Sequence, residues 1–269
     1  MVEMDFWEIY ALKYAERTDA LKHEHFLFAD AHNGPMPMDY FIWALKNEDG
    51  RVIVVDMGFE KSEAKKRGRN LLRTPAAALA GIGINAGEVE DLIVSHMHYD
   101  HCGNAKEFPK ATFYVQEREM AFATGANMKH SVFRDIFCVE YVVDMVRALY
   151  GDRLEFVDGF KELASGVTLH HVGGHTDGLQ VVRVNTKRGW VVLAVDAVHL
   201  YANMEENNPF PLVFNVADML NGYKSIASLA DSKKHIIPGH DPLVLARFPN
   251  VVDAEEFVVR VDLTPDNWD

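Results

Sequence analysis

The sequence predicts a single domain of the α/β class, in which two β-sheets pack together and helices lie outside them. Strand-like segments precede helix-like segments in both halves of the chain, without the strict alternation of a doubly wound single sheet. Most strands are fully apolar or linked by hairpins, which favours two packed sheets. No linker, repeat or low-complexity tract divides the 269 residues, so we expect one domain over residues 1–269.

The first half of the chain begins with strands that are rich in aromatic and β-branched residues. The Asp49-Gly50 pair is a hairpin signal between the second and third of them. Helical patterns cover residues 60–81, where Pro75 starts a new alanine-rich segment, and residues 116–149, with a break around Gly125. The strands are expected at residues 6–17, 39–46, 52–55, 92–94 and 112–115.

The second half of the chain contains a further group of strands, followed by one helix. The helix is expected at residues 216–231, and a short strand at 235–237 leads into the turn Pro238-Gly239-His240. No structure is assigned to residues 241–269. The strands before the helix are expected at residues 154–157, 167–172, 179–185 and 190–195.

Composition excludes several classes of protein. Asp and Glu number 40 against 27 Lys and Arg, for a formal net charge of −13, and an acidic surface repels phosphate backbones, so no nucleic-acid partner is expected. No segment approaches the ~18–20 apolar residues of a membrane span. Acids stand at the start of the chain where a signal peptide has Lys or Arg, so a cytoplasmic protein without a membrane partner is expected. Cys102 and Cys138 are too few for a disulfide framework.

The placement of the 13 histidines is the most informative feature. Ser95–His101 reads SHMHYDH, so four metal-binding side chains fall within six residues after an apolar strand. Residues two apart in an extended chain point the same way, so His96 and His98 can hold one ion. Asp100 and His101 follow where the chain turns and are free to face a neighbouring ion.

Three later residues complete the set of metal-binding side chains. His175 lies in the segment GGHTDG, Asp196 ends the apolar run VVLAVD, and His240 follows Pro238-Gly239. An apolar strand next to a turn lets a rigid sheet project such a ligand into a loop-lined cleft. We expect Asp196 to bridge two metal sites, one formed by His96, His98 and His175 and the other by Asp100, His101 and His240.

The donor types predict the metal and the reaction. Imidazole-rich sites with few carboxylates and no thiolate suit Zn²⁺, with Fe, Mn or Co as alternatives. Two divalent ions, less two carboxylates and a hydroxide, leave a positive centre that favours an anionic transition state, and therefore hydrolysis. Asp56, in the segment VVDMG, is expected to orient a ligand histidine or the backbone rather than to bind metal.

The string from His96 to His101, followed in order by His175, Asp196 and His240, resembles the metallo-β-lactamase superfamily. Its segments SHMHYDHCGN, GGHTDG and PGHD are most similar to N-acyl-homoserine lactonases and related lactone hydrolases. The resemblance covers roughly residues 6–245 and implies a four-layer αββα sandwich. It also implies that a metal-bridging hydroxide opens a lactone, with Asp100 shuttling the proton.

One position departs from the lactonase pattern. These enzymes commonly carry a Tyr three residues after the bridging Asp, where it contacts the substrate carbonyl, and this chain has His199. An imidazole can also donate a hydrogen bond to an oxyanion, so His199 is expected to take that role, a structural role being the alternative. Tyr201 is a nearby substitute. The expected catalytic residues are therefore Asp100, His199 and Tyr201, and the expected partner is a small-molecule lactone or ester.

Other functions stay open at this point. The same pair of ions would cleave another ester, a thioester, a phosphodiester or an organophosphate. A di-iron redox protein is a different class, but the resembling redox proteins replace some imidazoles with carboxylates and need a flavin. A metal-stabilised binding module would lose its fold on chelation. Exposed methionine and aromatic side chains would leave a homodimer open.

Overall fold

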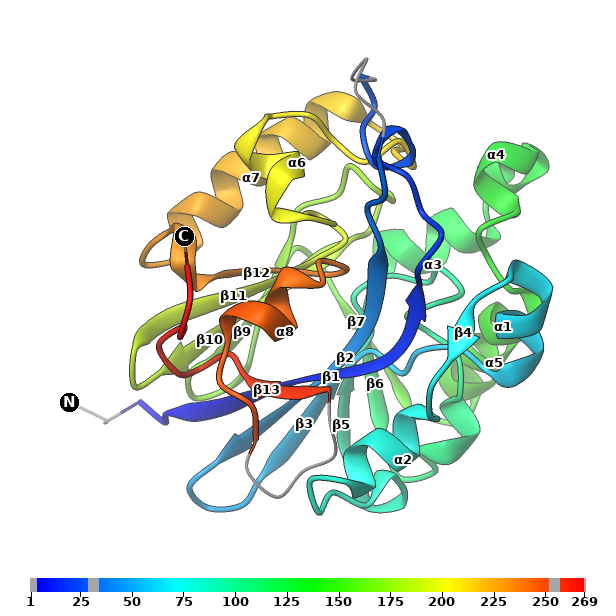
Figure 1. Cartoon of the computed structure of the whole chain (residues 1–269). Helices are drawn as coiled ribbons and strands as arrows, with labels where there is room; N and C mark the ends of the chain where they lie inside the picture. Colours follow the sequence, from blue (N-terminus) through cyan, green and yellow to red (C-terminus); the bar gives the residue numbers. More distant parts are fainter. Residues whose placement is uncertain (1–3, 29–33, 252–256, 269) are drawn as a thin grey trace.

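The computed structural model describes residues 4–28, 34–251 and 257–268, which form two β-sheets packed together (Figure 1). The first sheet has the order β13-β1-β2-β3-β5-β6-β7, and β4 pairs with β1 outside this path. Its strands are β1 (Trp7–Arg17), β2 (Met38–Asn47), β3 (Val52–Val55), β4 (Asn70–Leu71), β5 (Asp91–Ile93), β6 (Thr112–Gln116), β7 (Leu154–Val157) and β13 (Val258–Arg260).

The second sheet has the order β12-β11-β10-β9-β8. All its neighbours pair antiparallel except β11 and β12, which run parallel. Its strands are β8 (Phe160–Ala164), β9 (Val167–His171), β10 (Gln180–Thr186), β11 (Gly189–Val195) and β12 (Ile236–Pro238).

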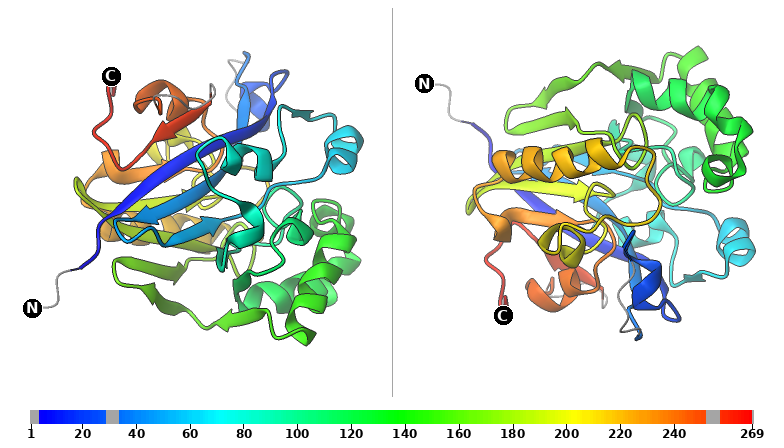
Figure 2. Two further views of the ribbon diagram at one scale, coloured as in Figure 1. Left: turned by 90° about the horizontal axis from the view of Figure 1, so that it is seen from below. Right: turned by 90° about the horizontal axis from the view of Figure 1, so that it is seen from above.

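Helices cover the outer faces of both sheets. α7 (Val216–Leu229) lies across the second sheet, and the helices on the opposite side of the molecule pack on the first sheet (Figure 2). Among the described residues, no helix is both long and apolar enough to cross a membrane. The other helices are α1 (Lys61–Arg67), α2 (Pro75–Ala80), α3 (Glu117–Thr124), α4 (Ser131–Arg134), α5 (Val139–Tyr150), α6 (Tyr201–Glu205) and α8 (Leu243–Arg247). Short 3-10 turns occupy Lys22–Glu24, Ala86–Glu88, Ala105–Glu107, Ala126–Lys129 and Lys233–His235.

Strand β2 shows why the sequence forms four layers. Its residues Tyr40 and Ile42 belong to the core beneath the helices, whereas Phe41 and Trp43 belong to the core between the sheets. Side chains alternate between the two faces of a strand, so a strand buried on both faces is apolar throughout. The predicted α/β class and αββα sandwich are thereby confirmed.

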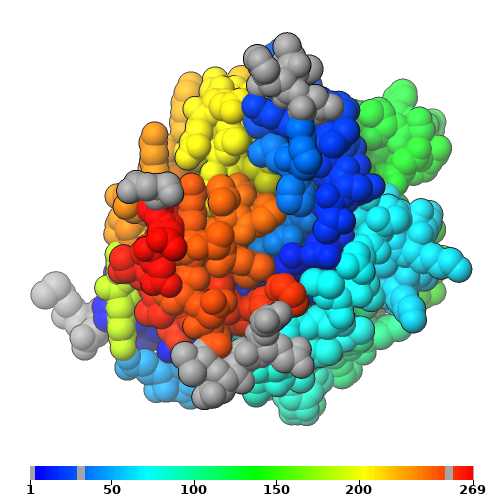
Figure 3. Space-filling model, in the orientation of Figure 1, coloured from blue at the N-terminus to red at the C-terminus, as the bar shows by residue number. Residues whose placement is uncertain are grey.

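Several short elements differ from the expectation. Residues 60–81 are not one helical stretch, because Gly68 ends α1 with a left-handed φ of 64° and β4 follows before Thr74 caps α2. β8 and α6 were not predicted. The unassigned C-terminal region contains α8 and β13, and β13 pairs antiparallel with β1. Figure 3 shows this region, in orange and red, filling the centre of one face of the molecule.

Candidate metal centre

The expected ligands come from loops at one edge of the sandwich. His96, His98, Asp100 and His101 follow β5, His175 lies between β9 and β10, and Asp196 and His240 follow β11 and β12. Because β11 and β12 run parallel, with Val195 opposite Pro238, the residues after them emerge at the same edge. Val195 has a φ of 40°, which β-branched residues rarely adopt, and this turn directs Asp196 off the strand. All seven side chains are buried.

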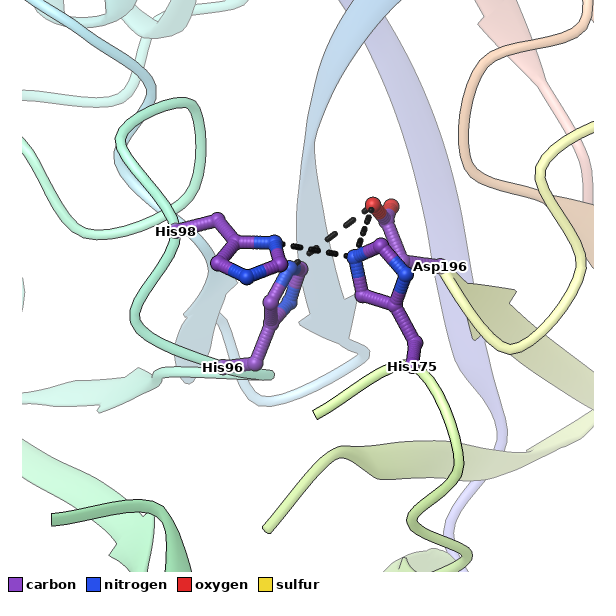
Figure 4. A group of neighbouring side chains, drawn as sticks. All are labelled: His96, His98, His175 and Asp196. Carbon is purple, nitrogen blue, oxygen red and sulfur yellow. Dashed lines mark hydrogen bonds and ion pairs between the residues drawn. The ribbon is translucent and has the colours of Figure 1, made fainter. Parts of the chain in front are cut away.

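The first group of side chains converges around one carboxylate oxygen (Figure 4). The Nε2 of His175 is 2.9 Å from the Nδ1 of His98 and 3.2 Å from the Oδ2 of Asp196. The Nε2 of His96 is 3.7 Å from the same oxygen. Four ligand atoms therefore lie within 4.8 Å of one another, which is the spacing that a single ion could span.

The second group faces the other oxygen of Asp196. The Nε2 atoms of His101 and His240 are 3.2 Å and 3.0 Å from Asp196 Oδ1. Each of these nitrogens is also 3.8 Å from Oδ2 of Asp100. The structure thus brings all seven expected ligands together, with the carboxylate of Asp196 between the two groups.

The buried polar atoms at the centre fit a metal. His96 Nε2, His101 Nε2 and Asp196 Oδ1 are fully buried and have no hydrogen-bond partner, a state that costs about 1–3 kcal/mol for each group. Cations held by the two groups would satisfy all three atoms. The donors are imidazole nitrogens and carboxylate oxygens, the set that Zn²⁺ and related divalent ions accept.

The outward ring nitrogens of three histidines are held by the protein. His101 Nδ1 is 2.7 Å from a carboxylate oxygen of Asp56, the orienting contact expected of this residue. His240 Nδ1 and His175 Nδ1 donate to the backbone carbonyls of Asp39 at 2.8 Å and Leu212 at 2.6 Å. Such partners fix the ring so that the free nitrogen faces the metal.

Burial and charge act on the histidines in opposite directions. Burial lowers the pKa of His96 and His98 well below the usual value, so both stay neutral, the form that binds metal. Burial also opposes protonation of His101, but the carboxylates of Asp196, Asp100 and Asp56 outweigh it and raise the pKa of this imidazole. The metal-free centre therefore favours a proton where a cation would bind.

The two further catalytic candidates lie in different surroundings. His199 Nε2 is 3.0 Å from Asp196 Oδ2, and its ring stacks on Phe210 at 3.9 Å. Burial lowers the pKa of His199 to about 3, so its ring is neutral. Tyr201 is not brought to the cluster: its ring packs 5.5 Å from that of Trp268 and 4.2 Å from the guanidinium of Arg247.

One buried polar side chain beside the cluster was not predicted from the sequence. Glu119, in the first turn of α3, is fully buried and accepts hydrogen bonds from Met97, Thr176 and Gly178. An acidic residue in the first turn of a helix is ordinary, so the sequence gives no sign of these contacts. Phe137 also contacts the cluster, with its ring 4.8 Å from that of His98.

A helix-covered β-sandwich with a buried cluster of imidazoles and carboxylates at its edge defines a metal-binding class of α/β protein. A sequence model described as the metallo-beta-lactamase superfamily matches residues 37–240. The chain belongs to the metallo-beta-lactamase superfamily.

Within this superfamily, the chain is similar to several N-acyl homoserine lactonases. An N-acyl homoserine lactonase of Bacillus sp. is 30% identical over 165 residues, 61% of this chain and 60% of the relative. N-acyl homoserine lactonase AttM of Azorhizobium caulinodans is 26% identical over 178 residues, 62% and 63% of the two chains. The chain therefore matches about three fifths of the length of these curated relatives. A crystal structure of a quorum-quenching N-acyl homoserine lactone lactonase superimposes with a TM-score of 0.72, at 21% identity and over 90% and 95% of the chains, which supports the fold.

Proposed function

We propose that this protein is a dinuclear metal-dependent hydrolase that opens lactones. The observation that carries the proposal is the position of Asp196, whose Oδ2 faces His175 at 3.2 Å and whose Oδ1 faces His240 at 3.0 Å. One carboxylate between two groups of imidazoles is the arrangement of a bridged pair of ions. The similarity to lactonases supports an acyl-homoserine lactone or a related lactone as substrate.

The chemistry of the site follows from its donors. Two divalent ions, Zn²⁺ first by donor type, would lower the pKa of a shared water molecule and supply hydroxide for attack on an ester carbonyl. His96, His98, His175, Asp100, His101 and His240 would hold the ions, and Asp196 would bridge them. The protein contributes rigid ligands, because the Asp56 carboxylate and the backbone carbonyls of Asp39 and Leu212 hold the rings of His101, His240 and His175 from behind.

Two side chains are assigned to the reaction itself. Asp100 is the least buried of the ligands, at 8% exposed, and we assign to it the transfer of the proton to the departing ring oxygen, which gives a hydroxy acid. His199 is stacked on Phe210 and held beside the cluster, where a neutral N–H can stabilise the oxyanion that forms from the carbonyl.

A lactone panel assayed by acid release, with metal content measured on the same sample, tests this function. We expect hydrolysis of acyl-homoserine or aromatic lactones by protein that holds two ions. Asp196→Asn should lose both metal and activity, whereas Asp158→Asn, at an exposed aspartate, should retain both. Cleavage of phosphodiesters alone would contradict the lactone assignment, and absence of metal would contradict the whole proposal.

A further inference from the structure

Glu119 is a buried carboxylate that the proposed reaction does not use. Its side chain is 0% exposed, and a buried carboxylate is costly unless several donors satisfy it. Its hydrogen bonds run to two loops that are far apart in sequence, rather than to a metal ligand.

The two loops linked by Glu119 are those that carry the first group of histidines. Oε1 accepts a hydrogen bond of 2.8 Å from the backbone N–H of Met97, which stands between His96 and His98. Oε2 accepts bonds of 2.6 Å from the Thr176 hydroxyl and 3.0 Å from the Gly178 N–H, both in the turn at residues 173–178 that carries His175. One carboxylate therefore joins the His96–His98 loop to the His175 turn.

The turn is fixed by close backbone contact as well. A Cβ on Gly178 would lie 2.1 Å from the backbone nitrogen of Glu119, and a Cβ on Gly174 would lie 2.5 Å from that of Met219. Both distances are shorter than real Cβ contacts allow. The turn is thus packed between the starts of α3 and α7, and Glu119 bonds it to the His96–His98 loop.

The second group of ligands is supported by residues other than Glu119, one of which, Ser95, also contacts His96 Nδ1 at 3.1 Å. His101 is held by Asp56, which Ser95 contacts through its N–H and its hydroxyl, each at 2.8 Å. His240 is held by the backbone of Asp39, with which it exchanges two hydrogen bonds. Among the described residues, the hydrogen bonds of Glu119 run to Met97, Thr176 and Gly178, and not to Asp56 or Asp39.

We propose that Glu119 is a positioning residue that sets the metal affinity of the His96, His98 and His175 site, by holding the His96–His98 loop against the His175 turn. The inference rests on the proposed two-metal function and deepens it. Loss of a partner that orients metal ligands costs about 10–100-fold in metal affinity, and here the loss is expected at one of the two sites only.

The test is Glu119→Gln, followed by metal titration rather than by activity alone. The amide keeps the shape but places N–H donors against the donors of Met97 or Gly178. Metal content is measured after dialysis against graded chelator, and anomalous diffraction assigns each remaining ion to its site. We expect about 10–100-fold weaker binding of the ion at His96, His98 and His175, with the other ion unchanged.

Two further variants complete the design. Glu117→Gln changes an exposed glutamate on the same helix and should bind both ions as the wild type does. Thr176→Val removes a single donor to Glu119 and should weaken the same site less strongly, which provides a test if Glu119→Gln does not fold. Equal weakening of both sites, or no weakening in either variant, overturns the positioning role and leaves the two-metal hydrolase intact. A wild type that binds no metal overturns the proposed function itself.

Discussion

At the scale of single residues, the centre is defined by which atom of each side chain faces inward. Asp196 has a histidine within 3.2 Å of each carboxylate oxygen, whereas His199 lies beside only one of them. His199 could also hold an ion together with Asp196 and His240, but each of the two expected sites has three ligands besides Asp196 without it, so His199 is left to contact a substrate. Tyr201 lies among Trp268 and Arg247 and has no such position.

The different surroundings of His199 and Tyr201 predict different effects of substitution on turnover. His199→Ala should lower kcat by about 10²–10³-fold, the usual cost of losing one oxyanion donor, with two metal ions still bound. Tyr201→Phe should leave kcat unchanged. Steady-state kinetics and metal analysis on the same preparations measure both. Unchanged turnover in His199→Ala would remove His199 from the mechanism, and a large loss in Tyr201→Phe would contradict the placement of that ring.

His199 also makes a prediction for metal-free protein. Burial lowers its pKa to about 3 in the folded state, below the ordinary value near 6.5 of an unfolded chain. The unfolded chain then binds the extra proton, so stability present above pH ~6.5 is lost as the pH falls towards 3. His199→Phe, measured by urea unfolding at several pH values, should lose less stability than the wild type over this range. An identical pH dependence would show that His199 is not buried as a neutral group.

At the scale of elements, the turn from Gly173 to Gly178 carries the strictest steric demand. A Cβ at Gly178 would lie 2.1 Å from the backbone nitrogen of Glu119 in α3. Any larger residue at this position would therefore have to move either the helix or the turn. Gly222 in α7 is different, because a Cβ there would meet only Val172, at 3.8 Å.

The two glycines form a matched pair. Gly178→Ala should lower the free energy of unfolding by about 1–3 kcal/mol, as overpacking does, and should weaken metal binding at His175. Gly222→Ala should raise the free energy of unfolding by about 0.5–1 kcal/mol, since alanine is favoured over glycine inside a helix. Urea unfolding of both variants measures the difference. A neutral Gly178→Ala would contradict the close contact of the turn with α3.

Elements with a strong local pattern could be predicted, and those made by distant contacts could not. β2 could be located by its continuous apolar and aromatic run, and α7 by its helical pattern. β4 consists only of Asn70 and Leu71 and is a strand because it pairs with β1, whereas the valines of β13 favour a strand but do not show that its partner is β1, at the other end of the chain. The same distinction holds at the site: the spacing of His96, His98 and His101 pointed to metal, whereas Glu119 has meaning only where two loops meet.

At the scale of the whole molecule, the two hydrophobic cores are built without the metal ligands. The core between the sheets and the core beneath α2, α3 and α5 consist of apolar side chains from both ends of the chain. Metal should therefore add stability and chemistry to a fold that forms without it.

Removal of metal should separate these contributions. Dialysis against a chelator should abolish hydrolysis while the far-ultraviolet circular dichroism of the sandwich is retained, with a lower melting temperature because bound ions stabilise the folded state. Re-addition of Zn²⁺ should restore activity. Loss of the circular dichroism signal on chelation would instead favour a metal-stabilised binding module.

Anomalous diffraction from crystals of the metal-loaded protein tests the central claim most directly. The account predicts two peaks about 3.5–4 Å apart, one beside His96, His98 and His175 and the other beside Asp100, His101 and His240, with one oxygen of Asp196 directed at each. A single peak, or none, in fully loaded protein would contradict it.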